Sequence, residues 1–194
     1  MYTLKILLGS TRPNRTSEKL LPWLQSELAR HTDIQVEVLD LRDNPLPFYD
    51  QPTSPSSVKD GVYPTEAATA WAQKIKEADA FLVIAPEYNH SFPAVLKNAF
   101  DTVYAEWNNK PIAFVAYGNV GGARSVEHLR GVAVELQMTP IRSALHIQAP
   151  WALMDEKGAF KPGTLESFNE PLHGIITQLS WWADALKVAR SSTK

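Results

Sequence analysis

Residues 80–89 read AFLVIAPEYN, and this stretch is the most informative about the fold. The segment before Pro86 is apolar throughout, which is typical of a strand buried on both faces of a sheet. Pro86 restricts the backbone and marks the end of that strand. Polar side chains follow at once, at Glu87, Tyr88 and Asn89. The abrupt change from core to polar residues predicts a binding edge where the strand ends.

Apolar strands and amphipathic helices alternate on both sides of this stretch. Strands that are apolar throughout, each followed by a helix, predict a parallel sheet covered on both faces. We therefore predict an α/β, flavodoxin-like, three-layer doubly wound fold with a five-stranded parallel sheet in the order 2-1-3-4-5. The predicted strands are 3–8, 34–41, 80–85, 112–117 and 141–147, and the predicted helices are 17–30, 65–78, 93–104, 123–136 and 165–188.

Composition limits the classes of function. The 194 residues are 44% hydrophobic and 21% charged, which predicts one globular domain spanning residues 1–194. A net charge of -2 without a basic cluster argues against nucleic acid and membrane surfaces as partners. The absence of cysteine excludes disulfides, thiolate metal ligands and a cysteine nucleophile. Because we find no leader or membrane-span pattern, we expect a cytoplasmic protein.

The first predicted strand runs into a loop that suits a phosphate. Residues 9–17 read GSTRPNRTS, with a glycine for a tight turn, hydroxyl groups and two arginines before a helix. An ordinary helix cap with two solvated arginines is the alternative. The loop lacks the G-x-G-x-x-G and G-x-x-x-x-G-K-[ST] patterns and has no cysteine nucleophile. We therefore predict a site that holds a phosphate rather than cleaves one.

Two further loops end at the same edge. Residues 87–90 could offer backbone N–H and C=O groups to the edge of a flat heteroaromatic ring. Residues 117–124 read YGNVGGAR, in which glycines allow close approach and Tyr117 could lie against a ring face. Each could instead be an ordinary turn between a strand and a helix. Because the carboxyl ends of the strands share one edge in a doubly wound sheet, we expect the three loops to form one site.

These motifs, together with LKNAFD at residues 96–101, closely resemble those of the NAD(P)H-dependent FMN reductases. This flavodoxin-fold family includes quinone, azo-dye and chromate reductases, and the resemblance runs from Leu4 to about Ile147. It implies noncovalent FMN as cofactor and NADPH or NADH as co-substrate. The cofactor-binding residues that it implies are Ser10, Arg12, Asn14, Arg15, Thr16 and Ser17 at the phosphate, and Pro86, Glu87, Tyr88, Asn89, Tyr117 and Gly118 around the isoalloxazine.

The resemblance also implies a reaction. Hydride passes from NAD(P)H to FMN N5 in a ping-pong scheme, and two electrons then pass to quinones, azo compounds, metal oxyanions or free flavin. Because the chemistry belongs to the cofactor, we name no catalytic side chain. Backbone N–H groups of the Tyr88–Asn89 loop would stabilise charge on the reduced ring. Substrate contacts are expected at His90, Gly121 and Gly122, and the spacing of the histidines predicts no metal site.

Two alternatives remain open at this point: a flavodoxin-type electron carrier and a non-enzymatic flavin-binding redox sensor. Such carriers are usually strongly acidic, so a net charge of -2 argues against the first. The proline-rich segment 42–64 is long for a connector, and we expect it to help wall the cleft. The resemblance implies a homodimer or homotetramer with its flavins near subunit contacts and with small-molecule electron acceptors as partners.

Overall fold

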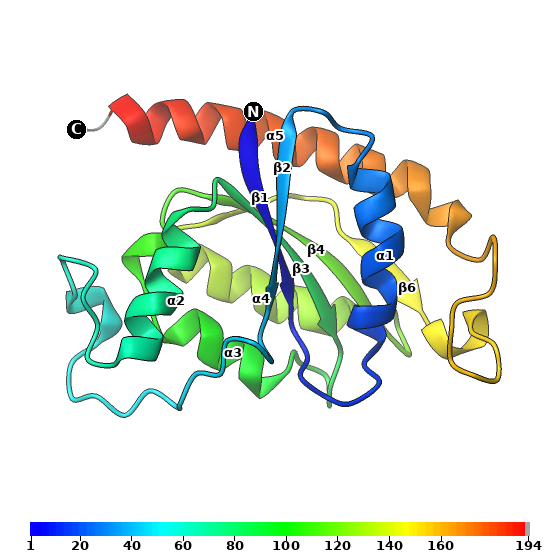
Figure 1. Ribbon diagram of the computed structural model, residues 1–194, viewed down its shortest axis with the longest axis horizontal. Coiled ribbons are helices and arrows are strands. Elements are labelled where there is room, and N and C mark those ends of the chain that lie inside the picture. The colour runs from blue at the N-terminus through cyan, green and yellow to red at the C-terminus, as the bar shows by residue number, and fades with distance from the viewer. Residues whose placement is uncertain (193–194) are drawn as a thin grey trace.

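The computed structural model describes residues 1–192 and arranges them in three layers, with a parallel sheet between two layers of helices (Figure 1). The main strands are β1 (Tyr2–Leu8), β2 (Ile34–Asp40), β3 (Ala80–Pro86) and β4 (Pro111–Gly118). They pair in parallel, and the sheet has the order β2-β1-β3-β4-β5. The predicted fold class and strand order are confirmed.

The last predicted strand is broken into two pieces. β5 (Thr139–Pro140) and β6 (Leu145–Gln148) both pair in parallel with β4. Pro140 has no N–H for a ladder hydrogen bond, and Arg130 donates to the carbonyls of Ile141 and Arg142, each at 2.6 Å. The prediction of one continuous strand over 141–147 was therefore wrong, because Arg130 of α4 binds the carbonyls of Ile141 and Arg142 and β6 begins only at Leu145.

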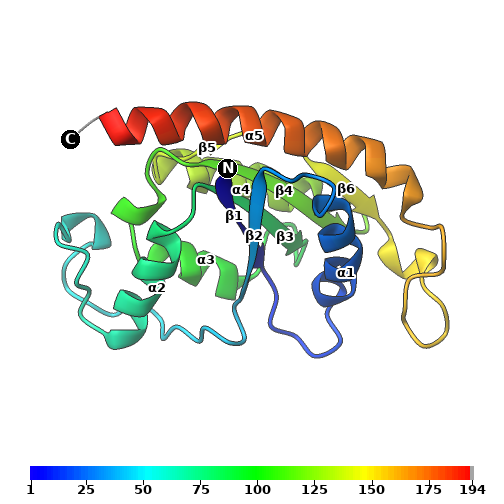
Figure 2. The same ribbon diagram turned by 45° about the horizontal axis from the view of Figure 1, so that its top comes forward.

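The helices divide between the two faces of the sheet (Figure 2). α1 (Thr16–Leu28) and the long α5 (Asn169–Ser192) pack on one face. α2 (Glu66–Lys76), α3 (Ala94–Asp101) and α4 (Ala123–Glu135) pack on the other. A hydrophobic core lies on each face of the sheet, and β1 contributes to both. Leu4 and Ile6 pack in the core on the α1 side, whereas Leu7 packs in the core on the α2 side. Within residues 1–192, no helix is long and apolar enough to cross a membrane.

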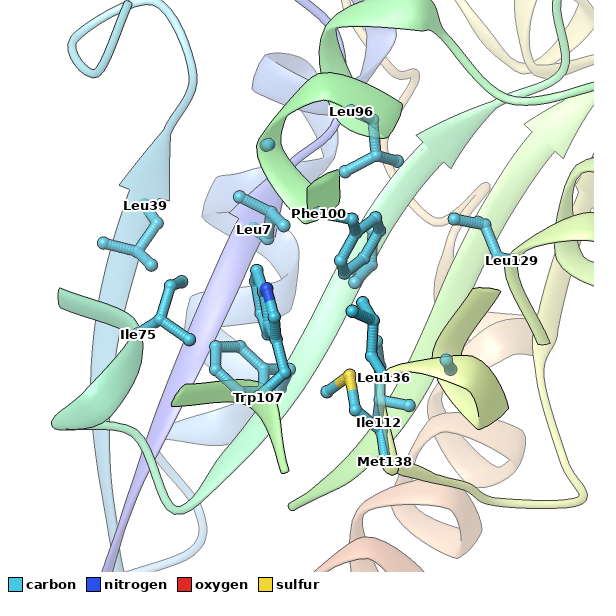
Figure 3. Close-up of a cluster of buried hydrophobic side chains, with 14 of the residues drawn as sticks. Leu7, Leu39, Ile75, Leu96, Phe100, Trp107, Ile112, Leu129, Leu136 and Met138 are labelled. Carbon is cyan, nitrogen blue, oxygen red and sulfur yellow. The ribbon is translucent and has the colours of Figure 1, made fainter. Parts of the chain in front are cut away.

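An aromatic cluster lies in the core between the sheet and α2, α3 and α4. Trp107, at the end of the 3-10 helix η2 (Ala105–Trp107), lies among the buried side chains of Figure 3 and is fully buried. Its ring centroid is 4.8 Å from that of Phe81 and 4.9 Å from that of Phe100. Tilted aromatic contacts at these distances are favourable, so α3 is held firmly against β3.

The proline-rich segment 42–64 contains only one short element, the 3-10 helix η1 (Pro55–Ser57). In Figure 1 this segment, coloured cyan, runs away from α1 toward α2. Asn98 in α3 donates its side-chain N–H groups to the carbonyls of Leu46 at 3.0 Å and Pro47 at 3.1 Å. The segment is therefore attached to the α2–α3 side of the molecule.

Candidate active site

The loops after β1, β3 and β4 meet at the carboxyl edge of the sheet, as the switch-point rule predicts. Together with the turn after β6 they line a cleft of about 390 Å³. Its lining residues are Arg12, Pro13, Asn14, Arg15, Thr16, Pro86, Glu87, Tyr88, Tyr117, Gly118, Asn119, Pro150 and Trp151. The three loops predicted to form one site are thus brought together.

Two arginine side chains beneath the loop after β1 donate hydrogen bonds to its backbone carbonyls. Arg15 Nη1 donates to the carbonyl of Ser10 at 2.5 Å. Arg42, which follows β2, donates through Nε to the carbonyl of Thr11 at 3.2 Å and through Nη2 to the carbonyl of Arg12. Because C=O and N–H point in opposite directions across a peptide bond, the loop turns its amides away from these arginines. The N–H groups opposite the Ser10 and Thr11 carbonyls are those of Thr11 and Arg12, and the latter lies 3.5 Å from Ser10 Oγ; Pro13, next along the loop, has no N–H.

The Arg15 guanidinium is fixed by a buried ion pair. Its side chain is only 2% exposed, and Nη1 lies 2.7 Å from Asp40 Oδ1, with a second hydrogen bond to Oδ2. Burial alone would raise the pKa of Asp40, but hydrogen bonds from Arg15 and from the Arg42 backbone N–H lower it overall. The structure therefore places Arg15 under the loop. A contact between Arg15 and a phosphate stays a prediction.

The N-terminus of α1 opens into the cleft without a side-chain cap. The Ser17 N–H donates to the Tyr117 hydroxyl at 3.2 Å, and among the described residues the buried Ser17 Oγ has no hydrogen-bond partner. A buried hydroxyl without a partner is costly, and helix N-termini attract anions. These features fit a phosphate group, which would accept from the Ser17 hydroxyl at the start of α1. Ser10 and Ser17 are not among the residues that line the cleft, so contacts from them stay predictions.

The two cleft tyrosines point toward this loop. The Tyr88 hydroxyl lies 2.9 Å from Ser10 Oγ, and the Tyr117 hydroxyl contacts α1 as described. Burial raises the pKa of Tyr117 to about 12, so its hydroxyl stays neutral at physiological pH. Tyr117 lines the cleft while its hydroxyl contacts the helix terminus, and a contact between its ring face and a flavin stays a prediction. Arg12 is exposed, with its guanidinium 5.4 Å from the centroid of the Tyr88 ring.

The loop after β3 is a tight turn. Tyr88 N–H donates to the carbonyl of Ser91 at 2.7 Å, and Ser91 N–H donates back at 3.0 Å. Asn89 and His90 occupy the tip with φ of 50° and 69°, the left-handed conformation of a two-residue hairpin turn. The Tyr88 N–H was expected to stabilise charge on the flavin, but this turn already uses it. Asn89 and His90 are exposed at the tip, so contacts from them stay predictions.

Glu87 links the loop after β3 to the start of α4 through hydrogen bonds. Its carboxylate accepts from Arg124 Nη1 at 2.6 Å and from the Arg124 backbone N–H at 3.1 Å, in the first turn of α4. Burial would raise the pKa of Glu87, but these hydrogen bonds outweigh burial and lower it. Glu87 therefore stays ionised and holds the two walls of the cleft at a constant separation.

The glycines after β4 allow that loop to pack closely on the sheet. Gly122 has φ of 72°, and a Cβ there would lie 2.6 Å from the Ala116 Cβ. Gly121 is also buried, against His146 of β6. Neither glycine is among the residues that line the cleft, so substrate contacts at Gly121 and Gly122 stay predictions.

Comparison with known proteins fits this geometry. The family model described as NADPH-dependent FMN reductase matches residues 3–151. The chain belongs to this family. An NAD(P)H-dependent FMN reductase of Schizosaccharomyces pombe is 38% identical over 142 residues, which cover 72% of this chain and 70% of that protein. A 2-hydroxy-1,4-benzoquinone reductase of Burkholderia sp is 34% identical over 140 residues, covering 69% and 70%.

The fold is shared with solved flavoenzymes. The NAD(P)H:(acceptor) oxidoreductase FerB of Paracoccus denitrificans superposes with a TM-score of 0.69 at 22% identity, covering 96% of this chain and 98% of that one. Membership of the FMN reductase family makes this chain an oxidoreductase, with FMN as cofactor and NAD(P)H as co-substrate. The resemblance found in the sequence motifs is confirmed.

Several residues of this family member's site escaped the sequence analysis. Pro150 and Trp151, which line the cleft, belong to the 3-10 helix η3 (Pro150–Leu153) after β6. Arg42, which follows β2, does not line the cleft but holds the carbonyls of Thr11 and Arg12. An aromatic residue three positions after the end of β6, at the ligand edge, was the available clue to Trp151. The proline-rich segment supplies none of the lining residues, so within one chain it does not wall the cleft as expected. Among residues 1–192, no group of His, Asp or Glu is arranged to hold a metal ion.

Proposed function

We propose that this chain carries electrons from NAD(P)H, through noncovalently bound FMN, to small quinone-like acceptors. The observation that carries the proposal is the start of α1, where Arg15 and Thr16 line a cleft built from three strand ends and where the buried Ser17 hydroxyl has no partner among residues 1–192. The quinone reductase among the relatives supports the acceptor class. Azo compounds, metal oxyanions and free flavin are further acceptors that we propose on the same basis.

Different residues of the cleft would bind the phosphate and the ring of FMN. Ser10, Arg12, Asn14, Thr16 and Ser17 would hold the phosphate, while the carbonyls of their loop are bound from beneath by Arg15 and Arg42. The loop at 86–89 and Gly118 would border the ring. When bound, FMN supplies the hydride-accepting and hydride-donating chemistry, so the protein's contribution is binding, orientation and exclusion of water. No side chain of fixed identity need act as acid or base.

Anaerobic stopped-flow mixing of the FMN-loaded protein with NADPH and then with a quinone tests the reaction. We expect fast bleaching of the flavin absorption followed by fast recovery on adding the quinone. A flavin that NADPH and NADH leave oxidised would contradict the proposal and favour an electron carrier. Comparing the two nucleotides in the same experiment decides which one is preferred.

The variant Arg12→Ala is the direct test of the phosphate site. Because Arg12 is exposed beside the loop, its loss should leave stability nearly unchanged. Loss of a charge-assisted hydrogen bond of about 1.5–3 kcal/mol should raise the FMN dissociation constant roughly 10- to 150-fold. Flavin fluorescence titration of the apoprotein measures it. Arg142→Ala, an exposed arginine that does not line the cleft, is the matched control, and equal affinity in the two variants would contradict the assignment.

We propose further that the active unit is a homodimer or homotetramer in which segment 42–64 covers the cleft of another subunit. Phe48 and Val62 of this segment are 78% and 65% exposed, and no residue of the segment lines the cleft of its own chain. Deleting part of residues 54–60 should then raise KM for nicotinamide or acceptor. Light scattering that finds a fully active monomer would contradict this arrangement.

A further inference from the structure

We propose that Trp151 is a stacking platform for a flat heteroaromatic ring bound in the cleft. Trp151 lies in η3 and lines the cleft, yet its side chain is 57% exposed. Neither the family match, which ends at residue 151, nor any sequence motif assigns this residue a role. The inference rests on the proposed function, because it requires a ring-bearing ligand in this cleft.

The backbone presents Trp151 on a rigid turn. Ala149, which precedes η3, has φ of 44°, a left-handed conformation that is costly for alanine. Its N–H donates to the carbonyl of Gly118 at 2.8 Å, which joins the turn to the loop after β4. The carbonyl of Leu153 accepts from the Lys161 N–H at 3.0 Å, and Pro150 is buried. Strained backbone held by such contacts is characteristic of functional sites.

Exposure by itself does not distinguish Trp151 from the other exposed tryptophan, but its place on the cleft wall does. Trp181 offers a comparison, since it is 64% exposed on α5 and its ring meets that of Trp182 edge to face at 5.0 Å. Trp151 instead lies on the wall of a cleft that also contains polar loops. A large aromatic side chain at such a place provides apolar contact area with little loss of side-chain freedom on binding.

The charges of the cleft indicate what kind of ring is bound. Arg15 and Glu87 of the lining are paired with Asp40 and Arg124. Arg12 is the exposed cation of the lining, and the N-terminus of α1 also opens into the cleft. The ligand is therefore a ring that carries an anionic phosphate group. Both FMN and the nicotinamide dinucleotide have this chemistry, and measurements on each distinguish the two sources.

The experiment compares Trp151→Ala, Trp151→Leu and Trp151→Phe with Trp181→Ala as matched control. FMN affinity is measured by fluorescence titration of the apoprotein. Nucleotide affinity is measured without turnover, from the shift of the flavin absorption band when the FMN-loaded protein is titrated with oxidised NADP. Stacking on aromatic side chains changes affinity by about 5- to 150-fold per ring.

We expect Trp151→Ala and Trp151→Leu to weaken one of these affinities about 10-fold and Trp151→Phe to stay within about 3-fold of the wild type, because only phenylalanine keeps a ring. Weaker FMN binding identifies the flavin as the stacked ring, and weaker nucleotide binding identifies the nicotinamide dinucleotide. Wild-type affinities in both the alanine and the leucine variants would overturn the inference, as would a leucine variant equal to the phenylalanine variant. A wild-type protein that binds no FMN would instead refute the proposed function, and the inference with it.

Discussion

Replacing Asp40 with alanine is expected to lower the free energy of unfolding by about 3 kcal/mol, because the buried Arg15 guanidinium loses its main acidic partner and keeps only Glu18. The Arg15 side chain that would remain is 2% exposed, with Glu18 as a second acidic neighbour at 3.4 Å from its Nε. Asp40 also accepts from the Arg42 backbone N–H at 2.9 Å. The variant therefore loosens both arginines that hold the carbonyls of the phosphate loop.

Urea unfolding of the apoprotein and FMN titration measure the two consequences. We expect Asp40→Ala to weaken FMN binding as well as stability, because the loop amides lose their fixed orientation. Asp43→Ala is the matched control, since Asp43 is an exposed aspartate only a few residues along the same loop. If both variants unfold within about 0.5 kcal/mol of the wild type, which is the usual range for surface substitutions, the ion pair does not support the loop.

The same ion pair gives an expected pH dependence. The pKa of Asp40 is lower in the folded chain than its ordinary value near 3.8. A carboxyl group of this kind stabilises the fold above its unfolded pKa, and that contribution is lost as the pH falls through the folded pKa. The difference in unfolding free energy between the wild type and Asp40→Asn should therefore be constant near neutral pH and shrink below about pH 4. A difference that does not change with pH would show that the charge of Asp40 is irrelevant.

The second large effect is expected from Gly122→Ala, which should destabilise the chain by about 2–5 kcal/mol, combining left-handed strain with overpacking. The new Cβ would lie 2.6 Å from the Ala116 Cβ and 2.8 Å from the Tyr117 backbone nitrogen. Backbone atoms of a central strand cannot move aside cheaply, so the loop would have to lift from β4. Tyr117, whose hydroxyl contacts the start of α1, would shift with it.

Thermal unfolding and FMN titration of Gly122→Ala measure this effect. Gly131→Ala is the control, because Gly131 is exposed within α4 and a Cβ there would meet nothing within 4 Å. Alanine is the better helix former by about 0.5–1 kcal/mol, so the control should be slightly more stable than the wild type. A Gly122→Ala protein as stable as the control would show that the loop after β4 tolerates displacement.

The fold and the place of the site could be predicted from local sequence. The apolar runs at 80–85 and 112–117 specify strands buried on both faces, since only a parallel sheet covered by helices accommodates them. Once the strands are parallel, their carboxyl ends must share one edge, and the loops at 9–17, 86–90 and 117–124 must meet there. The break in the last strand could not be predicted, because it depends on Arg130 of a neighbouring helix.

The tertiary structure alone decided what each side chain does. Arg12 and Arg15 look alike in the loop GSTRPNRTS, but Arg15 meets Asp40 across 25 residues of sequence and turns inward, while Arg12 stays exposed. Tyr117 likewise contacts Ser17 across 100 residues. Long side chains can reach in several directions from one backbone position, and the partner that fixes the direction lies elsewhere in the chain. Local sequence therefore specified the strands and the binding edge, and packing between distant segments selected which residues face the ligand.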